Sequence, residues 1–178
     1  MSATGLVTTP QQRGEELEAR IHRHIALARA MQVRVASFDG ERLVLTAPLA
    51  ANLNDKGTGF AGSLATLVTL SGWALATLLG EACGDACEAA VYHSELDFLR
   101  PVREELRAEA WLAGEGTPAA GNEPAAAGDA GAVARLHERL QAGKRAKLAI
   151  RARLGDADNP AVVFAGNYAV WRVGTQPI

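Results

Sequence analysis

The chain has 178 residues, of which 18 are basic and 20 are acidic, so its formal net charge is −2. This length suits one domain with a substantial buried core. The near balance of charge argues against a nucleic-acid partner, which calls for a basic surface, and against a polybasic membrane anchor.

The first residues, MSATGLVTTP, contain neither the basic nor the apolar segment of a signal peptide, which predicts a cytoplasmic protein. The two cysteines, Cys83 and Cys87, are too few for a disulfide scaffold or a structural zinc site. We interpret both as small buried residues, with a redox-active or accidental disulfide as the alternative. We expect no metal ion and no cofactor.

The N-terminal part is predicted to hold a helix and a hairpin. Residues 1–13 are expected to be a flexible terminus, and residues 15–31 a helix, because apolar residues recur there at helical spacing. Strands are expected over residues 32–38 and 42–49, joined at Asp39 and Gly40, a typical hairpin pair.

A long helix is predicted over residues 60–81, after a loop at residues 50–57. No residue from 57 to 80 is charged, and a run of that length could span a bilayer. The threonines and serines within it, and the strand-like segments on either side, favour a buried core helix instead.

Four more strands are expected, over residues 88–99, 105–113, 143–154 and 161–173, with a short helix at residues 132–141. Residues 114–131, rich in Ala, Gly and Pro, are predicted to form a disordered or weakly ordered insertion. Alternation within the first of these strands places two sets of residues on opposite faces: Tyr92, Leu96 and Phe98 against Val91, His93, Glu95 and Asp97.

These elements predict an α+β fold. A helix that is apolar nearly all round needs neighbours on every side, and a curved antiparallel sheet wrapped around it supplies most of them. Residues 14–178 are therefore expected to form a single domain, with the N-terminal helix as an addition to the sheet and its central helix.

The segment from Asn54 to Ser63 leads directly into the long helix and carries the strongest indication of chemistry. The first N–H groups of a helix lack internal partners and lie at its positive end. Small residues at Gly59, Ala61 and Gly62 would let a ligand approach this backbone, which suits the oxygen of a polarised carbonyl. The alternative is a glycine-rich helix start that only packs tightly.

A stripe on one face of the same helix comprises Gly62, Thr66, Thr69, Trp73 and Thr77. Its hydroxyls could line a narrow channel or position a water molecule. Alternatively, the threonines bond to carbonyls of their own helix and face the sheet.

Three residues outside the helix are weaker candidates. Ser94, on the face expected toward the helix, could hold a water molecule, whereas His93 is expected to face outward or toward a partner subunit. Arg100, beside Pro101, could meet a phosphate, although a solvated charge at a strand end is the alternative.

The sequence resembles hotdog-fold thioesterases. Asn54 and Gly57 match their Asn-x-x-Gly loop, and Phe60, Ala61 and Gly62 occupy the place of a His-Gly-Gly helix start. Together with Ser71-Gly72-Trp73 and Leu96-Asp-Phe-Leu-Arg-Pro101, this block is similar to the YiiD C-terminal thioesterase family. The resemblance covers residues 15–173 apart from the insertion.

That resemblance implies a hotdog fold, a homodimer or dimer of dimers, and acyl-CoA or acyl-carrier-protein thioesters as substrates. In many such enzymes the helix start polarises the thioester carbonyl, and a helix carboxylate across the dimer activates water. Here Thr69 stands where that carboxylate is expected. Threonine cannot act as a general base near neutral pH, but it can orient water.

We therefore predict a thioester hydrolase in which catalysis involves Asn54, Ala61, Gly62 and Thr69. The expected substrate-binding residues are Gly57, Thr58, Gly59, Phe60, Ser63, Thr66, Ser94 and Arg100. Two alternatives remain open. One is an acyl-thioester sensor or scaffold without turnover, favoured by the missing carboxylate. The other is an acyl hydratase or dehydratase, which would need a histidine such as His93 inside the channel.

Overall fold

The computed structural model describes residues 9–114 and 130–175. The helices are α1 (Pro10–His24), α2 (Ala26–Ala30), the short 3-10 helix η1 (Leu49–Asn52), α3 (Ala61–Glu81) and α4 (Ala130–Gln141). The strands are β1 (Arg34–Phe38), β2 (Arg42–Ala47), β3 (Cys87–Phe98), β4 (Leu106–Leu112), β5 (Ala146–Gly155) and β6 (Pro160–Arg172).

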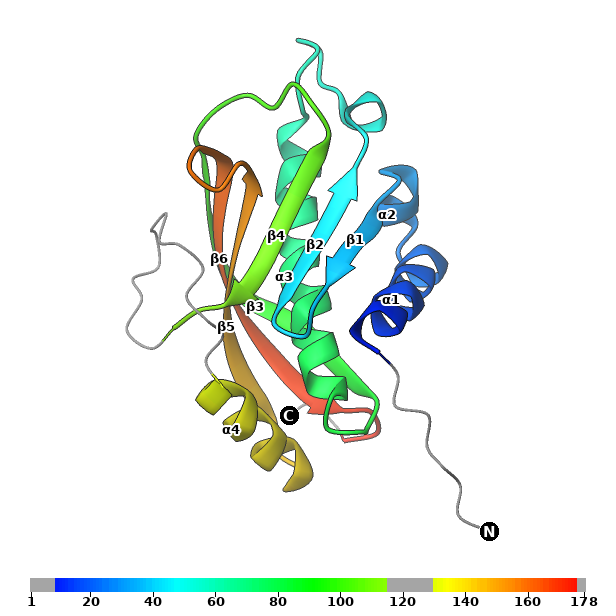
Figure 1. The fold of residues 1–178 in the computed structure, drawn as a ribbon, viewed down its shortest axis with the longest axis vertical. Coiled ribbons are helices and arrows are strands. Elements are labelled where there is room, and N and C mark those ends of the chain that lie inside the picture. The colour runs from blue at the N-terminus through cyan, green and yellow to red at the C-terminus, as the bar shows by residue number, and fades with distance from the viewer. Residues whose placement is uncertain (1–8, 115–129, 176–178) are drawn as a thin grey trace.

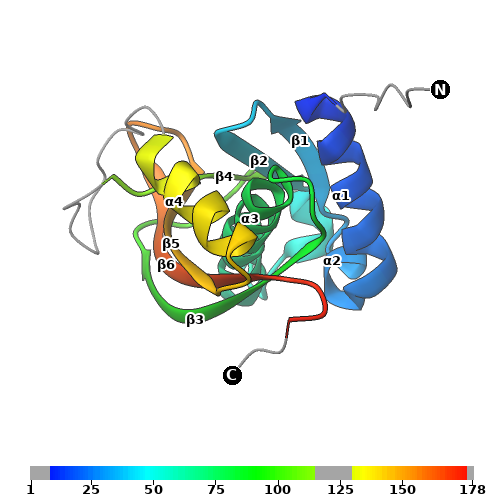
Figure 2. The ribbon, with the colours of Figure 1, turned by 90° about the horizontal axis from the view of Figure 1, so that it is seen from below.

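The strands form one antiparallel sheet in the order β1-β2-β4-β5-β6-β3. The sheet curves around α3, which it contacts along β2, β3, β4, β5 and β6, while α1 and α2 lie beside β1 (Figures 1 and 2). The predicted α+β architecture is therefore confirmed. Helix α3 is a core helix, because 67% of its most apolar stretch is buried inside the protein.

Close packing against β6 explains why α3 carries glycine in its middle. A Cβ atom on Gly72 would lie only 2.3 Å from the hydroxyl oxygen of Tyr168. That hydroxyl donates a 2.9 Å hydrogen bond to the carbonyl of Thr69, and its burial raises the pKa of Tyr168. The central helix is thus held at a fixed depth against the sheet.

The N-terminal helix differs from its prediction in two respects. It begins at Pro10 rather than at Glu15, because Thr9 and Gln12 form a reciprocal capping box and proline suits the first helical turn. It also breaks at Ile25, whose extended backbone (φ −117°) separates α1 from α2. Residues 10–13 therefore belong to a helix, and the rest of the predicted flexible terminus, apart from Thr9, lies outside the described residues.

Strand β3 forms one edge of the sheet and pairs only with β6 among the described strands. A β-bulge between Val91 and His93 shifts its register. Val91 pairs with the buried Tyr168 and so shares the α3-facing side with Leu96, whereas Tyr92 lies on the outer face, where the Lys147 ammonium stands over its ring. The predicted faces of this strand are therefore wrong for Val91 and Tyr92, because strict alternation cannot anticipate a bulge.

Both described ends of the chain lie near the C-terminal end of α3. The guanidinium group of Arg13 donates to the carbonyl of Leu78 in the last turns of that helix. At the other end, the Val173 amide donates to Ala86, in the turn that follows α3. The predicted insertion lies outside the described residues except at Gly114, which follows β4, and at residues 130–131, which belong to α4 rather than to a disordered segment.

Candidate functional site at the start of the central helix

The loop before α3 is organised by the amide side chain of Asn54. Its oxygen accepts from the backbone N–H groups of Lys56 and Thr58, and its nitrogen donates to the Thr58 hydroxyl and the Gly59 carbonyl. Gly57 occupies the left-handed region at φ 72°, which closes the turn. All four hydrogen-bonding positions of the Asn54 amide serve the loop, so in this geometry it positions backbone rather than water.

The same loop fixes where α3 begins. The Gly59 amide donates to the Val102 carbonyl at 2.8 Å, and the Phe60 amide donates to Asn52 at 2.7 Å. A Cβ atom at Gly59 would lie 3.0 Å from Leu64 Cδ2 and 3.2 Å from Val102 Cβ, so glycine lets the chain pass here without displacing either side chain. The N-terminus of α3 is therefore held by backbone contacts on two sides.

Three N–H groups remain at this helix start. Phe60 is the N-cap residue and provides no side-chain hydrogen bond. Within the described part of the chain, the amides of Ala61, Gly62 and Ser63 have no hydrogen-bond acceptor. Since they lie at the positive end of a helix of 21 residues, they favour an oxygen atom that carries negative charge.

The ring of Phe60 covers part of this helix start. A Cβ atom on Gly62 would lie 2.4 Å from Phe60 Cε1, so the ring rests directly against the glycine backbone. Phe60 is nevertheless 52% exposed. Glycine at position 62 thus makes room for an aromatic ring beside the three amides.

An apolar groove of about 440 Å³ follows the same helix from one turn beyond Gly62. Its lining combines α3 with the α1–α2 junction and the edge strand: Ile25, Ala65, Thr66, Thr69, Leu70, Trp73 and Val91. None of the described residues that line it carries a charged side chain. The groove suits an uncharged, extended apolar group rather than an ionic one.

The threonines of the predicted stripe behave differently from one another. Thr66 Oγ1 donates to the Gly62 carbonyl at 2.8 Å, and the Thr77 hydroxyl donates to the Trp73 carbonyl at 2.9 Å. Back-bonding is thus correct for these two. The Thr69 hydroxyl lies on the groove and has no hydrogen-bond partner among the described residues, so it is available to water or to a ligand.

The other candidates lie apart from this groove. Arg100 donates from Nε to the Pro160 carbonyl at 3.2 Å and lies beside the β5–β6 turn. Ser94 pairs with Gly166 on the α3-facing side of β3 but does not line the groove. His93 is exposed on the outer face, 3.5 Å from Glu95, which places this pair on the opposite side of the sheet from α3.

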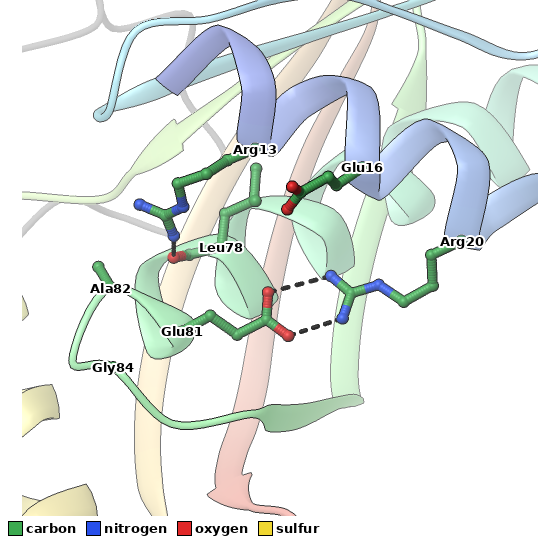
Figure 3. A pocket seen from close by; sticks show the side chains of 7 residues that line it. All are labelled: Arg13, Glu16, Arg20, Leu78, Glu81, Ala82 and Gly84. Atoms are coloured by element: carbon green, nitrogen blue, oxygen red, sulfur yellow. Dashed lines mark hydrogen bonds and ion pairs between the residues drawn. The ribbon is translucent and has the colours of Figure 1, made fainter. Parts of the chain in front are cut away.

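A larger hollow, of about 720 Å³, lies between α1 and the C-terminal end of α3 (Figure 3). The Arg20 guanidinium spans it to form a two-pronged ion pair with Glu81, at 2.6 and 3.1 Å. That hydrogen-bonded carboxylate raises the pKa of Arg20. Because Arg13 also bonds to the Leu78 carbonyl there, two cations stand at the negative end of α3. The hollow therefore serves the docking of α1 and contains none of the predicted site residues.

Both cysteines are free thiols at the end of α3. Cys87 is buried, and this burial, strengthened by the neighbouring Cys83, raises its pKa to about 12. Such a thiol carries no nucleophilic charge near neutral pH. Among the described residues, no group of three histidine, cysteine or acidic side chains could hold a metal ion.

Four residues that line the groove are absent from the predicted site: Ile25, Ala65, Leu70 and Val91. The break that exposes Ile25 has no sequence marker such as Pro or Gly, and the bulge in β3 reverses the face expected for Val91. The 3.0 Å bond from Trp73 Nε1 to the Ala89 carbonyl, which joins the helix to the edge strand, also leaves no local pattern in the sequence.

Comparison with known proteins gives a consistent family and fold. The family model described as "Putative thioesterase (yiiD_Cterm)" matches residues 14–172. A protein of unknown function from Chlorobaculum tepidum TLS is similar in structure, with a TM-score of 0.78 and 25% identity over 93% of this chain and 98% of that chain.

Two further solved structures have the same fold. A putative thioesterase from Shewanella oneidensis has a TM-score of 0.70 and 24% identity, covering 89% of this chain and 96% of that chain. A thioesterase from Haemophilus influenzae has a TM-score of 0.62 and 12% identity, covering 90% and 92%. These likenesses confirm the hotdog fold, and the family match shows that the chain belongs to the YiiD C-terminal family of putative thioesterases.

Proposed function

We propose that this protein hydrolyses acyl thioesters carried by coenzyme A or by acyl carrier protein, in the cytoplasm and without an added cofactor. Water attacks the thioester carbonyl carbon, the carbon–sulfur bond breaks, and a carboxylic acid and a thiol are released. The observation that carries the proposal is the run of three amides at the start of α3 that have no acceptor among residues 9–114 and 130–175, one turn from an apolar groove.

The amides of Ala61 and Gly62 would hold the thioester oxygen as it gains negative charge. One oriented donor of this kind contributes about 3 kcal/mol to a transition state. The loop residues Gly57, Thr58 and Gly59, with the Asn54 amide, keep the helix start in place. Phe60, Ser63 and Thr66 would contact the substrate around the carbonyl, and Ser94 or Arg100 could reach its more distant parts.

Thr69 would orient the attacking water. It would do so for a thioester bound at the α3 start of a second copy, not at the α3 start of its own chain. Seven residues separate Gly62 from Thr69, and a rise of ~1.5 Å per residue puts them about 10 Å apart along α3. One carbonyl carbon cannot lie beside both. A second copy of the chain, which supplies its own Thr69 across an interface, would complete the site.

The edge strand β3 is where we place that second copy. Its outer edge pairs with no strand in the described part of the chain, and four large apolar residues at or just beyond it are exposed by 40% to 55%: Val91, Tyr92, Phe98 and Leu99. Long apolar edges of this kind are usually covered in a stable protein. We therefore propose a homodimer through β3, as a unit by itself or within a dimer of dimers.

The test is thiol release from a panel of acyl-CoA and acyl-carrier-protein thioesters. We expect Thr69→Val to reduce kcat by about 10- to 100-fold, because the variant keeps the shape but loses the hydroxyl that orients water. Thr69→Ser should retain most of the activity. Thr77→Val is the matched control, since that hydroxyl is buried and bonded within the helix.

The alternatives make different predictions in the same assay. Tight acyl-CoA binding with no thiol release from any substrate would contradict hydrolysis and favour a sensor. Equal rates for Thr69→Val and the wild type would remove Thr69 from the mechanism. The exposed His93, on the outer face of the sheet, gives no support to a hydratase.

A further inference from the structure

The apolar groove ends abruptly at Trp73. From Gly62 to Thr69 the groove-facing positions of α3 are only partly buried, but from Ala74 to Gly80 every residue of the helix is buried. Trp73 is therefore the last residue on this face that a molecule in the groove can reach. Beyond it the helix is enclosed by the sheet, with Gly80 packed against Cys87 and Val170.

The indole ring of Trp73 is fixed in this position. Its Nε1–H donates a 3.0 Å hydrogen bond to the carbonyl of Ala89 on β3, while the side chain packs against the hydrophobic core. A bond from helix to strand prevents the ring from rotating away without losing a partner for a partly buried donor. Trp73 is thus a rigid boundary rather than an adaptable one.

The groove is also lined from two other elements. Ile25 comes from the α1–α2 junction and Val91 from the edge strand, two residues after the Ala89 that accepts the indole bond. Among the described residues, the lining of the groove carries no charged side chain, and its polar side-chain groups are the hydroxyls of Thr66 and Thr69 and the indole N–H of Trp73. An alkyl chain fits such a groove, whereas a phosphate or a carboxylate would lose hydration without gaining a charged partner.

We propose that Trp73 closes the end of an acyl-chain groove and so determines the longest acyl chain that the protein accepts. The inference rests on the proposed function and adds to it the residue that determines specificity. Counting ~1.5 Å per residue, the helix start and Trp73 are about 16 Å apart. The groove therefore suits chains of short to medium length better than long ones.

The experiment measures kcat and KM for a series of saturated acyl-CoAs of increasing length, with wild type, Trp73→Leu and Trp73→Phe. We expect wild-type kcat/KM to rise with length and then fall at a limit. Trp73→Leu should move that limit to chains at least about two carbons longer, mainly through a lower KM for the long substrates. For the shortest acyl groups, which do not reach Trp73, the change in kcat/KM should be smaller than for the long ones.

Controls separate a specific effect from a loosened fold. Trp171→Phe changes another tryptophan, which bonds to Glu88, outside the groove, and should leave the length profile unchanged. Ala65→Leu fills the groove from its other end and should shift the limit toward shorter chains. Thermal unfolding of each variant checks that it is folded. An identical limit in wild type and in a folded Trp73→Leu protein would overturn the proposal.

A second readout keeps the proposal testable if no thioester is hydrolysed. In a chain with Trp111→Phe and Trp171→Phe, Trp73 is the remaining tryptophan. Non-hydrolysable S-alkyl-CoA thioethers of increasing length are titrated into this protein. A change in Trp73 fluorescence that begins only at the longer alkyl chains supports Trp73 as the end of the groove, even without turnover. Absence of binding, or binding of long chains with no change in Trp73 fluorescence, contradicts it.

Discussion

The contact between Phe60 and Gly62 puts an aromatic ring beside the amides of Ala61, Gly62 and Ser63, which have no acceptor among the described residues. Because the ring is half exposed, a methyl group at position 62 can push it aside without disturbing the core. The added methyl group and the displaced ring would then both stand near the proposed position of the thioester oxygen. We therefore expect glycine at this position to matter for substrate access more than for folding.

We therefore expect Gly62→Ala to slow thiol release by about tenfold or more, which corresponds to roughly 1.4 kcal/mol in the barrier. The melting temperature should be unchanged or raised, because alanine is the better helix former. Steady-state kinetics and thermal unfolding together measure the two effects.

The double variant Phe60→Ala/Gly62→Ala separates the ring from the methyl group. Partial recovery of the rate would show that the displaced ring blocks the amides. A Gly62→Ala protein as active as wild type would mean that substrate does not approach this backbone.

Between elements, Glu18 joins α1 to β1. Its carboxylate accepts a 2.7 Å bond from the Val35 amide and another of 2.7 Å from Arg34. Burial by itself would raise the pKa of Glu18, but the hydrogen bonds from Val35 and Arg34 outweigh it and hold the pKa below its usual value. The charged form is thus the one that stabilises the fold.

A carboxyl group with a lowered pKa contributes stability above its unfolded pKa, near 4.3, and loses it as the pH falls through the folded value. We expect Glu18→Gln to reduce the free energy of unfolding by about 1 to 2 kcal/mol near neutral pH. The difference from wild type should shrink in acid, below both pKa values. Urea unfolding of the variant and the wild type, near neutral pH and in acid, measures this difference. The exposed Glu16→Gln is the matched control. A difference that stays constant with pH would exclude the carboxylate charge as its origin.

The elements themselves were largely predictable from the sequence, whereas their local irregularities were not. Periodicity predicts α3 and the six strands because long patterns of burial average over many side chains. The bulge at Val91 and the helix break at Ile25 each depend on contacts between distant segments, so no neighbouring residue marks them. The start of α1 is different: Thr9, Pro10 and Gln12 form a recognisable cap that outweighs the absence of apolar spacing before Leu17.

The same contrast applies to the site. The glycines and small residues at the start of α3 point to accessible backbone, which sequence alone indicates. The structure was needed to tell Thr69, whose hydroxyl has no partner among the described residues, from Thr66 and Thr77, which bond back to their helix. It was also needed to find that the Asn54 amide is fully engaged in its loop.

At the scale of the whole molecule, a site shared between two copies can be recognised by complementation between two impaired variants. If Gly62 of one chain acts with Thr69 of its partner, then chains carrying Gly62→Ala and chains carrying Thr69→Val should each be impaired alone. Mixed and reassembled, half of the dimers would be hybrids with one intact site. We expect recovery to about one quarter of the wild-type rate, as the statistics of a two-fold symmetric dimer require.

Lysines on the edge strand provide the control for that experiment. Ala90→Lys with Tyr92→Lys, both on exposed positions of β3, should shift the protein toward the monomer in light scattering and prevent recovery. Ala149→Lys, exposed on the central strand β5, should do neither. Impaired chains that do not recover on mixing, while still forming dimers, would place the whole site within one chain.

The position of the chain ends has a practical consequence for attachment. Arg13 and Val173 are both held at the end of the molecule where α3 finishes, opposite the end where it begins. A segment that precedes Thr9 or follows Thr175 therefore leaves from the end of the molecule opposite the loop around Asn54. The fold is suited to immobilisation, or to tandem fusion with a second protein, through either end of the described chain.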